Sequence, residues 1–414
     1  MFILASILFR LLIELSYVNI ISQRFIYDGF VLDFNYTQYL FSWILYFISF
    51  LSVNKTLGRL SDMFFLTAHL SVITPLLVLY GLDDSRDSLV ATLFVVTFLI
   101  MKILVEKPRI SGARLKTLKE GKSMAIGVSV FFVIGLISWV FITNVKLNFN
   151  FLNVYEYRSE NSSVLSGGIL SYTNNWTYQV FNIFLFSFFL AKKKYIFAFF
   201  CFLAQVVFFA SFAHKSILFF PFLVLMVWFF FRGDKNKSLT IFPLAFSLVI
   251  TLTVTSYYLT GEVISSSMFS RRLFFVPANL SFAYFEFFFN NQFVLWSNSV
   301  FEFFLEYPYS KRVPHVIGDY LGYNDVGANT GFIASAFGHA GFLGIVAYGL
   351  IIICFLRFLN FATKGYIPLW FAVALFIVPF RSMLISSDLL TVFLTHGFLV
   401  AVILVILFRR GRKS

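Results

Sequence analysis

The sequence predicts an all-α polytopic membrane protein with about twelve transmembrane helices and two long outer loops, residues 144–175 and 260–330. Of its 414 residues, 59% are hydrophobic and only 12% are charged, whereas soluble domains carry about 25% charged residues. The mean hydropathy is +0.86, and apolar runs long enough to cross a bilayer recur along the chain. No stretch between these runs could form a soluble core, so residues 1–414 are expected to be one integral membrane domain.

The first apolar run, residues 2–21, lacks a small-residue cleavage site and is therefore interpreted as a span rather than a removed signal peptide. Arg10 and Glu14 lie four residues apart in it and are expected to pair on one helix face. The region 195–231 could instead form a re-entrant pair, because its two halves are short. The expected spans are 2–21, 37–53, 61–81, 88–105, 124–143, 176–191, 195–212, 216–231, 239–259, 331–356, 366–386 and 389–408.

The positive charges predict the orientation. If the C-terminal tail RRGRKS is cytoplasmic, alternate connectors place 20 of the 32 Lys and Arg residues on the cytoplasmic side. Both termini are then cytoplasmic, and the two long loops face outward. The net charge of +13 is spread thinly over inner connectors, which excludes a nucleic-acid partner and leaves the lipid bilayer. The two cysteines each lie inside an apolar run, so neither a disulfide nor a metal site is expected.

Cations in the outer loops oppose the positive-inside bias and therefore indicate a ligand. Lys215 lies at a span end, where it either faces a cavity or reaches the headgroups. Arg271 and Arg272 are adjacent, so one is expected to bind the ligand and the other to pair with a carboxylate. A lipid-linked phosphate or diphosphate fits, because Arg binds phosphate bidentately and cations stabilise a departing diphosphate. The chain has no DxD motif, so no metal or cofactor is expected.

The polar segment 260–331 is expected to form much of the site, because long loops in compact proteins are usually functional. Its aromatic part, 274–304, predicts one or two helices lying in the outer interface. Tyr284 and Trp296 would offer stacking surfaces there, although a lid without chemistry is the alternative. The Pro- and Gly-rich part, 307–331, predicts ordered turns rather than a helix.

Candidate bases for deprotonating an attacking hydroxyl are the carboxylates Asp319 and Asp325 and the histidines. A lone Asp in a turn more often serves turn chemistry. His339 lies among small residues that let helices approach closely. It is interpreted as a site residue at a cavity floor, with a packing histidine as the alternative. Arg312 and His315 add further charge to the same loop.

Four segments in order resemble the O-antigen polymerase family, the oligosaccharide repeat-unit polymerases of bacterial surface polysaccharide assembly. They are the Arg272, Pro277, Tyr284 and Phe288 series, LWSNS at 295–299, VPHVIGDYLG at 313–322 and ANTGFIASAFGHAGFLG, which includes Asn329, at 328–344. The resemblance is specific across about 270–345 and architectural elsewhere.

This resemblance implies a multi-pass protein of the bacterial inner membrane, with a fold similar to the multi-span, GT-C-like glycosyltransferases and a site on the periplasmic face. It implies transfer of a growing glycan from undecaprenyl diphosphate to a new lipid-linked repeat unit, in O-antigen, lipopolysaccharide or capsule synthesis. A chain-length regulator and a flippase of the same pathway are implied partners. Arg158, Arg271 and Arg272 are the implied diphosphate-binding residues. Members of the family have Arg-rich motifs that end in Gly in two outer loops, and Arg158 followed by Gly167 and Gly168 matches such a motif loosely.

Two other classes of function remain open at this point. A glycan ligase, or another lipid-linked glycosyltransferase, would share the architecture, the donor and the cations and differ in its acceptor. A polysaccharide transporter or flippase should show internal repeats and broken, polar spans near the midplane. The chain has no clear repeat, and its polar residues gather in the outer loops.

Overall fold

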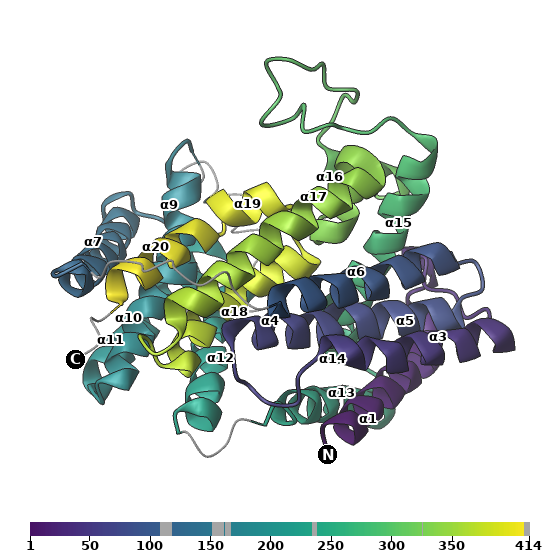
Figure 1. Ribbon diagram of the computed structural model, residues 1–414, viewed down its shortest axis with the longest axis horizontal. Helices are drawn as coiled ribbons and strands as arrows, with labels where there is room; N and C mark the ends of the chain where they lie inside the picture. The colour runs from purple at the N-terminus through teal and green to yellow at the C-terminus, as the bar shows by residue number, and fades with distance from the viewer. Residues whose placement is uncertain (108–117, 151–160, 162–166, 234–237, 325, 410–414) are drawn as a thin grey trace.

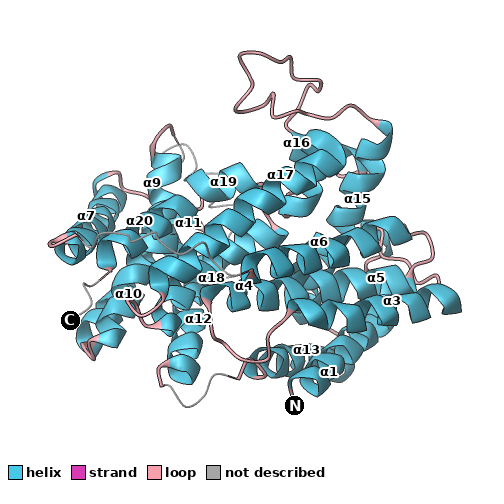
Figure 2. Cartoon of the chain, viewed as in Figure 1, coloured by secondary structure: helices cyan, strands magenta, loops and turns pink. Residues whose placement is uncertain are grey.

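The computed structural model describes residues 1–107, 118–150, 161, 167–233, 238–324 and 326–409, and this part of the chain consists of helices joined by loops, with no β-strand (Figure 2). The α-helices are α1 Phe2–Ser16, α2 Ser22–Arg24, α3 Tyr36–Ser49, α4 Leu60–Ala68, α5 Thr74–Leu82, α6 Ser88–Glu106, α7 Gly121–Ile142, α9 Leu170–Trp176, α10 Asn182–Ala191, α11 Tyr195–Phe212, α12 Lys215–Phe231, α13 Ile241–Thr260, α14 Ile264–Ser266, α15 Val276–Asn290, α16 Val313–Tyr320, α17 Phe332–Thr363, α18 Leu369–Ile385, α19 Leu389–Leu394 and α20 Phe398–Phe408.

Short π-helical turns join several of these helices end to end. The turns η1 (Tyr17–Ile21), η4 (His69–Ile73), η5 (Thr177–Phe181) and η6 (Ser267–Phe275) link α1 to α2, α4 to α5, α9 to α10 and α14 to α15. Two 3₁₀ turns, η2 (Ile26–Asp28) and η3 (Phe50–Ser52), lie in connectors or at a helix end.

Seven helices in the described part of the chain are long and apolar enough to cross a membrane, and the protein is therefore membrane-embedded. They are Phe2–Arg24, Leu60–Leu82, Ser88–Glu106, Gly121–Ile142, Tyr195–Phe212, Ile241–Thr260 and Phe332–Thr363. The shorter helices α12, α18 and α20 are also apolar. Every expected apolar run coincides with helix, and residues 195–231 form two separate helices, α11 and α12.

The helices form two groups on either side of the long helix α17 (Figure 1). One group contains α1, α3, α5, α6 and α13, in which α1 packs against α13 and α3 against α5. The other contains α7, α10, α11, α12 and α20, in which α10 packs against α11. Helix α17 contacts α6 of the first group and α20 of the second, so the two groups meet along it.

The predicted pair Arg10–Glu14 is confirmed, and it is buried inside the first group. Arg10 Nε donates to Glu14 Oε1 at 2.8 Å, and its other nitrogens donate to the carbonyl and hydroxyl oxygens of Ser42 at 3.0 and 2.6 Å. Its guanidinium also stacks 3.9 Å from the Trp43 ring centroid. Because all these donors are satisfied, a charge at membrane depth is tolerated here.

One sequence-based expectation about local structure, that 307–331 forms turns rather than a helix, was wrong, and the structure refines two others. The last expected span is broken into α19 and α20 at Gly397, whose φ of +73° suits glycine. The segment 307–331 contains helix α16, which tolerates Pro314 because proline fits the first helical turn. The aromatic segment 274–304 forms one helix, α15, only as far as Asn290. That helix is buried along most of its length, and its chain continues as the irregular loop 291–312 above it in Figure 1.

Candidate functional site

A cavity of about 550 Å³, called here the His339 cavity, is lined by residues of α15, α16, the first part of α17 and the start of α19. Polar side chains from widely separated parts of the sequence line it, which is typical of a ligand site. The lining residues are Tyr284, Val294, Asn298, Ser299, Arg312, Val313, Pro314, His315, Gly327, Asn329, Thr330, Ser335, Gly338, His339, Ser387, Asp388, Leu390 and Thr391.

Five of the predicted site residues come together in this cavity. They are Tyr284, Arg312, His315, Asn329 and His339. Arg312 and His315 enter from the start of α16, and His339 enters from α17. The prediction that segment 260–331 forms much of a site therefore agrees with where these side chains lie.

A kink in α17 shapes the floor of the cavity. Ala340 has φ −152° and ψ 34°, and Gly341 has φ +58° and ψ −140°, so the helix is interrupted directly after His339. The interruption frees carbonyl groups of the preceding turn, which need other donors. Backbone N–H groups of the LWSNS region supply them, because Val294 donates to Gly338 O at 3.0 Å and Leu295 to His339 O at 2.9 Å.

These backbone bonds bring Trp296 onto His339, where the two rings stack at 5.0 Å between centroids and 11° between planes. Trp296 Nε1 donates to Tyr348 Oη at 2.8 Å, and Tyr348 Oη donates to Asp388 Oδ2 at 2.9 Å. Trp296 therefore packs against the His339 ring and holds the Tyr348 hydroxyl beside Asp388.

His339 and Asp388 form a partly buried pair at 3.2 Å between Nε2 and Oδ2. A carboxylate only accepts hydrogen bonds, so Nε2 carries the hydrogen and Nδ1 carries the lone pair of the neutral ring. Nδ1 is buried and has no hydrogen-bond partner among the described residues. The pair thus has the arrangement of a general base, in which a carboxylate orients an imidazole.

Asp388 remains ionised in this setting. Burial by itself raises the pKa of its carboxyl group, but hydrogen bonds from His339, from the Leu390 N–H and from the Tyr348 hydroxyl outweigh burial and lower the pKa below its ordinary value. The backbone bond, from Leu390 N to Asp388 Oδ1 at 2.9 Å, is the cap of helix α19.

A second histidine fixes the turn that presents Asp388. Gln179 Nε2 donates to His396 Nδ1 at 3.2 Å, so the opposite nitrogen, Nε2, carries the hydrogen and donates to Ser387 Oγ at 2.9 Å. Ser387 Oγ in turn donates to the Ser386 carbonyl at 2.7 Å. Ser387 is therefore held by hydrogen bonds rather than activated as a nucleophile.

Tyr284 has a structural contact in the cavity wall. Its side chain is buried, and its hydroxyl donates to Ala328 O at 2.9 Å. This bond ties α15 to the segment 327–330 that carries Asn329. We therefore do not expect a ligand to stack on Tyr284, because its ring lies inside the fold.

The remaining described candidates lie outside the lining of this cavity. Arg271 pairs with Asp28, and its guanidinium lies 4.6 Å from the Phe25 ring centroid, as expected for one member of the Arg pair. Arg272 is exposed on η6, and Lys215 begins α12. Asp319 pairs with Lys311 at 2.7 Å near the surface.

Two predicted residues, Arg158 and Asp325, lie outside the described residues. Within the described part of the chain, no three His, Cys, Asp or Glu side chains gather closely enough to hold a metal ion.

Sequence reasoning missed Ser387, Asp388 and Thr391, which reach the cavity from the start of α19 and the connector before it, about fifty residues after His339. One signal was present, because Asp388 is the only carboxylate in the connector between the expected spans 366–386 and 389–408. A lone Asp before an apolar run also indicates a helix cap, and here Asp388 serves both purposes.

The fold and the cavity define an all-helical, membrane-embedded protein with a polar site at one end of its central helix. Comparison of the chain with family models, with curated protein sequences and with solved structures finds no match.

Proposed function

We propose that this protein is a glycosyltransferase that polymerises lipid-linked oligosaccharide repeat units on the outer face of a bacterial inner membrane. In this proposal it has about twelve membrane spans, and the His339 cavity is its active site. The growing glycan on undecaprenyl diphosphate is the donor, and a new lipid-linked repeat unit is the acceptor. The resemblance across residues 270–345 supports this reaction, because most of the cavity lining falls in or beside that segment.

The observation that supports the proposal best is that a cation and a histidine–carboxylate pair line the same cavity. Arg312 lines one wall beside His315, and the His339–Asp388 pair lines the floor. A cation suits the departing diphosphate, and a carboxylate-oriented imidazole suits removal of a proton from an attacking hydroxyl. A transfer reaction needs both groups within one substrate's reach.

In the proposed step, the acceptor hydroxyl oxygen attacks the anomeric carbon of the donor glycan. The bond between that carbon and the diphosphate oxygen breaks, and the lipid diphosphate leaves with the electron pair. The hydroxyl proton passes to His339, whose positive charge Asp388 then stabilises. Arg312 and the Asn329 amide are placed to hold the diphosphate oxygens.

The decisive experiment supplies purified protein with lipid-linked repeat units and separates the glycans on a gel. A ladder whose rungs differ by one repeat unit is expected. Transfer to a different acceptor, such as lipid A core, without a ladder would make the protein a ligase. Movement of the lipid-linked glycan across liposomes without any transfer would make it a flippase and overturn the proposal.

Variants connect this activity to the cavity. Arg312→Ala and His339→Gln are each expected to slow ladder formation by 100-fold or more, a size typical of losing a general base or a charge-stabilising group. The neighbouring variant Lys311→Ala is the matched control, because it removes one positive charge next to Arg312 from a residue outside the cavity lining, and the ion pair that it breaks with Asp319 is exposed. Equal losses in Lys311→Ala and Arg312→Ala would argue against a role for the cavity.

Arg272 tests the implied diphosphate site separately. Arg272→Ala should shorten the polymer if the exposed guanidinium of η6 guides the donor to the cavity, and Arg272→Lys should restore only part of the activity because the bidentate fork is lost. Wild-type polymer length in Arg272→Ala, with normal protein levels, would remove Arg272 from the donor site.

A further inference from the structure

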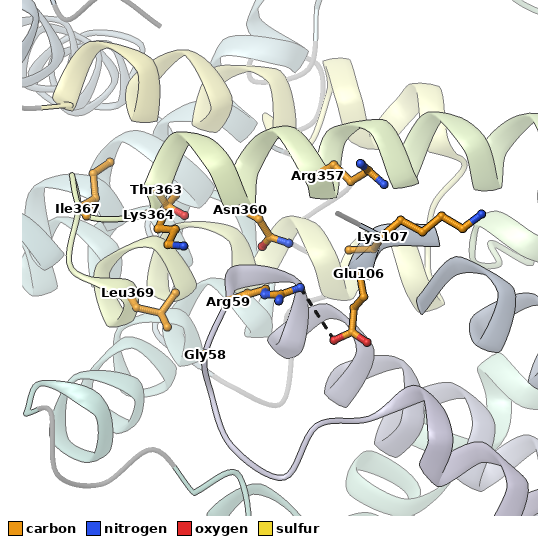
Figure 3. A pocket seen from close by; sticks show the side chains of 12 residues that line it. Gly58, Arg59, Glu106, Lys107, Arg357, Asn360, Thr363, Lys364, Ile367 and Leu369 are labelled. Carbon is orange, nitrogen blue, oxygen red and sulfur yellow. Dashed lines mark ion pairs between the residues drawn. The ribbon is translucent and has the colours of Figure 1, made fainter. Parts of the chain in front are cut away.

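A second cavity, called here the Arg59 pocket, has a volume of about 570 Å³ and lies at the other end of α17 (Figure 3). Its walls come from the start of α4, the end of α6 and the turn between α17 and α18. All three regions belong to connectors that the charge distribution places on the cytoplasmic side. None of the residues assigned to the proposed transfer reaction lies in it.

The pocket carries an excess of positive charge. Arg59, Lys107, Arg357 and Lys364 line it, against the single carboxylate of Glu106. Figure 3 shows Asn360 between the ends of Lys364 and Arg59, while Lys107 and Arg357 extend toward the opposite end of the pocket.

The one carboxylate is already shared among cations. Glu106 Oε1 lies 3.1 Å from Lys102 Nζ and 4.0 Å from Arg59 Nη1. Lys102 is buried between Glu106 and Asp62, so the two cations Arg59 and Lys102 and the two carboxylates together carry no net charge. The excess positive charge of the pocket therefore comes from Lys107, Arg357 and Lys364. In the described part of the chain, no hydrogen bond or ion pair is formed by the side chains of Lys107 and Lys364.

Hydrogen bonds tie together the helices that carry these cations. The Asn360 amide accepts from Ser61 N at 3.0 Å and donates to Ser61 Oγ at 2.8 Å, which ties α17 to α4. Arg357 Nη1 donates to Leu104 O at 2.6 Å, which ties α17 to α6. The helical frame of the pocket is therefore preorganised, and a ligand has mainly the Lys107 and Lys364 side chains to order.

Another cation borders the same turn. Arg409 is buried, and its guanidinium stacks 4.0 Å from the ring centroid of Tyr366, the residue between Gly365 and Ile367 of the lining. Its Nε and Nη1 atoms have no hydrogen-bond partner among the described residues. Its charge therefore adds to the positive potential at this end of the molecule.

We propose that the Arg59 pocket binds the phosphate of an anionic phospholipid head group from the cytoplasmic leaflet. Basic pockets between transmembrane helices on that side are suited to such head groups. The shared chemistry, a phosphate among Arg and Lys, would also suit a soluble phosphate. The apolar side chains of Val105, Ile367 and Leu369 in the same lining favour the lipid, because they offer contacts to glycerol and acyl carbons.

The test titrates the full-length protein in detergent with three probes: dioctanoyl phosphatidylglycerol, dioctanoyl phosphatidylcholine and inorganic phosphate. Wild-type protein is expected to bind the phosphatidylglycerol more tightly than the phosphatidylcholine. The variant Arg59→Gln/Lys364→Gln is expected to bind phosphatidylglycerol about 30-fold more weakly, from the loss of two basic residues. The matched control Lys192→Gln/Lys193→Gln removes two exposed charges from another connector on the same predicted side and should bind like wild type.

Unchanged phosphatidylglycerol binding in the double variant would overturn the site, as would an equal loss in the control. Displacement of the lipid by millimolar inorganic phosphate, with equal binding of both lipids, would make the ligand a soluble phosphate and overturn the lipid assignment. Thermal unfolding of each variant shows whether it folds. If the double variant does not, Lys364→Gln alone carries the test, with about a fivefold loss expected.

Discussion

Asp388 shows how a single residue can serve both the fold and the candidate site. Its Oδ1 atom caps helix α19, and its Oδ2 atom accepts from Tyr348 and His339. About a quarter of its side chain remains exposed, toward the His339 cavity. A buried charge is retained in this way only when several donors satisfy it.

The Asp388→Asn variant is expected to lower the melting temperature at neutral pH, because the donors around the carboxylate lose a charged acceptor. The pKa of Asp388 is lower in the folded protein than its ordinary value, so its stabilising contribution is complete above that ordinary value, near pH 4, and is lost as the pH falls further. The difference from wild type should therefore persist at pH 5 and close below about pH 4. Thermal unfolding between pH 3 and 8 measures this, and a difference that has closed by pH 5 would contradict it.

Arg10 and Glu14 illustrate the cost of breaking a buried pair. Arg10→Met leaves the Glu14 carboxylate buried with only the Tyr39 hydroxyl at 3.0 Å, which is expected to cost about 3–5 kcal/mol. The double variant Arg10→Met/Glu14→Leu removes both charges and should recover most of that loss. Thermal unfolding of both proteins in detergent provides the comparison, and equal destabilisation of the two would show that the pairing is not what matters.

Among the elements, α17 has the largest influence on the site. Its kink frees two carbonyl groups for the LWSNS region, and its small residues allow close packing. At Gly338 an added Cβ would lie 2.6 Å from Cε2 of Phe288 in α15, so the two helices approach as the small-residue pattern predicted. At Gly331 an added Cβ would lie 1.9 Å from Leu384 O, at the end of α18.

Gly338→Ala is expected to destabilise the protein by about 1–3 kcal/mol, because the buried Phe288 ring must move to admit the methyl group. Gly349→Ala in the same helix is the matched control, since nothing lies within 4 Å of its added Cβ. It should be neutral or stabilising by up to about 1 kcal/mol, the usual helix preference for alanine. Chemical or thermal unfolding distinguishes the two, and equal effects would mean that α15 does not constrain Gly338.

For the whole molecule, the two cavities lie at opposite ends of α17. The rise of an α-helix gives a separation of about 30 Å between His339 and Asn360, which is close to the thickness of a bilayer's hydrocarbon core. Their chemistry also differs. One cavity holds a histidine–carboxylate pair, and the other holds mostly cations.

Thiol labelling tests that topology. In a background with Cys201→Ser and Cys354→Ser, a cysteine at Phe303, whose surface is 95% exposed, should react with a membrane-impermeant reagent added outside intact cells. A cysteine at Lys192, in the short connector between α10 and α11, should react only after the membrane is opened. The opposite pattern would reverse the predicted orientation, and reaction of both from outside would place an even number of spans between them instead of the three expected.

Local sequence patterns predicted more of the helices than of their interruptions. Every expected apolar run coincided with helix, because burial of backbone polar groups in lipid leaves the helix as the natural solution for such a run, whereas α2, α14, α15 and α16 lie outside these runs. The kink at Ala340 and Gly341 was not expected, since it depends on donors from the loop 291–312 to satisfy the freed carbonyls. Helix α16 was missed because Pro314 was counted as a turn residue, although proline is well tolerated in a first helical turn.

The sequence likewise predicted some of the residues that line the candidate site and not others. Tyr284, Arg312, His315, Asn329 and His339 were found from the sequence because they lie in or beside one polar segment between apolar runs. The sequence could not show which of the outer-loop cations line the cavity. Arg271 and Arg272 are neighbours in sequence, yet one is occupied by Asp28, a residue more than two hundred positions away.

The sequence by itself determined that this chain is an all-helical membrane protein and that its polar chemistry concentrates in residues 260–344, because composition and the spacing of apolar runs follow directly from the cost of placing polar groups in lipid. Only the tertiary structure decided that Asp388 orients His339, that Arg271 is used by the fold, and that four cations from distant segments share the Arg59 pocket. These depend on distances of a few ångströms between residues far apart in the chain, which helix packing sets and local pattern does not record.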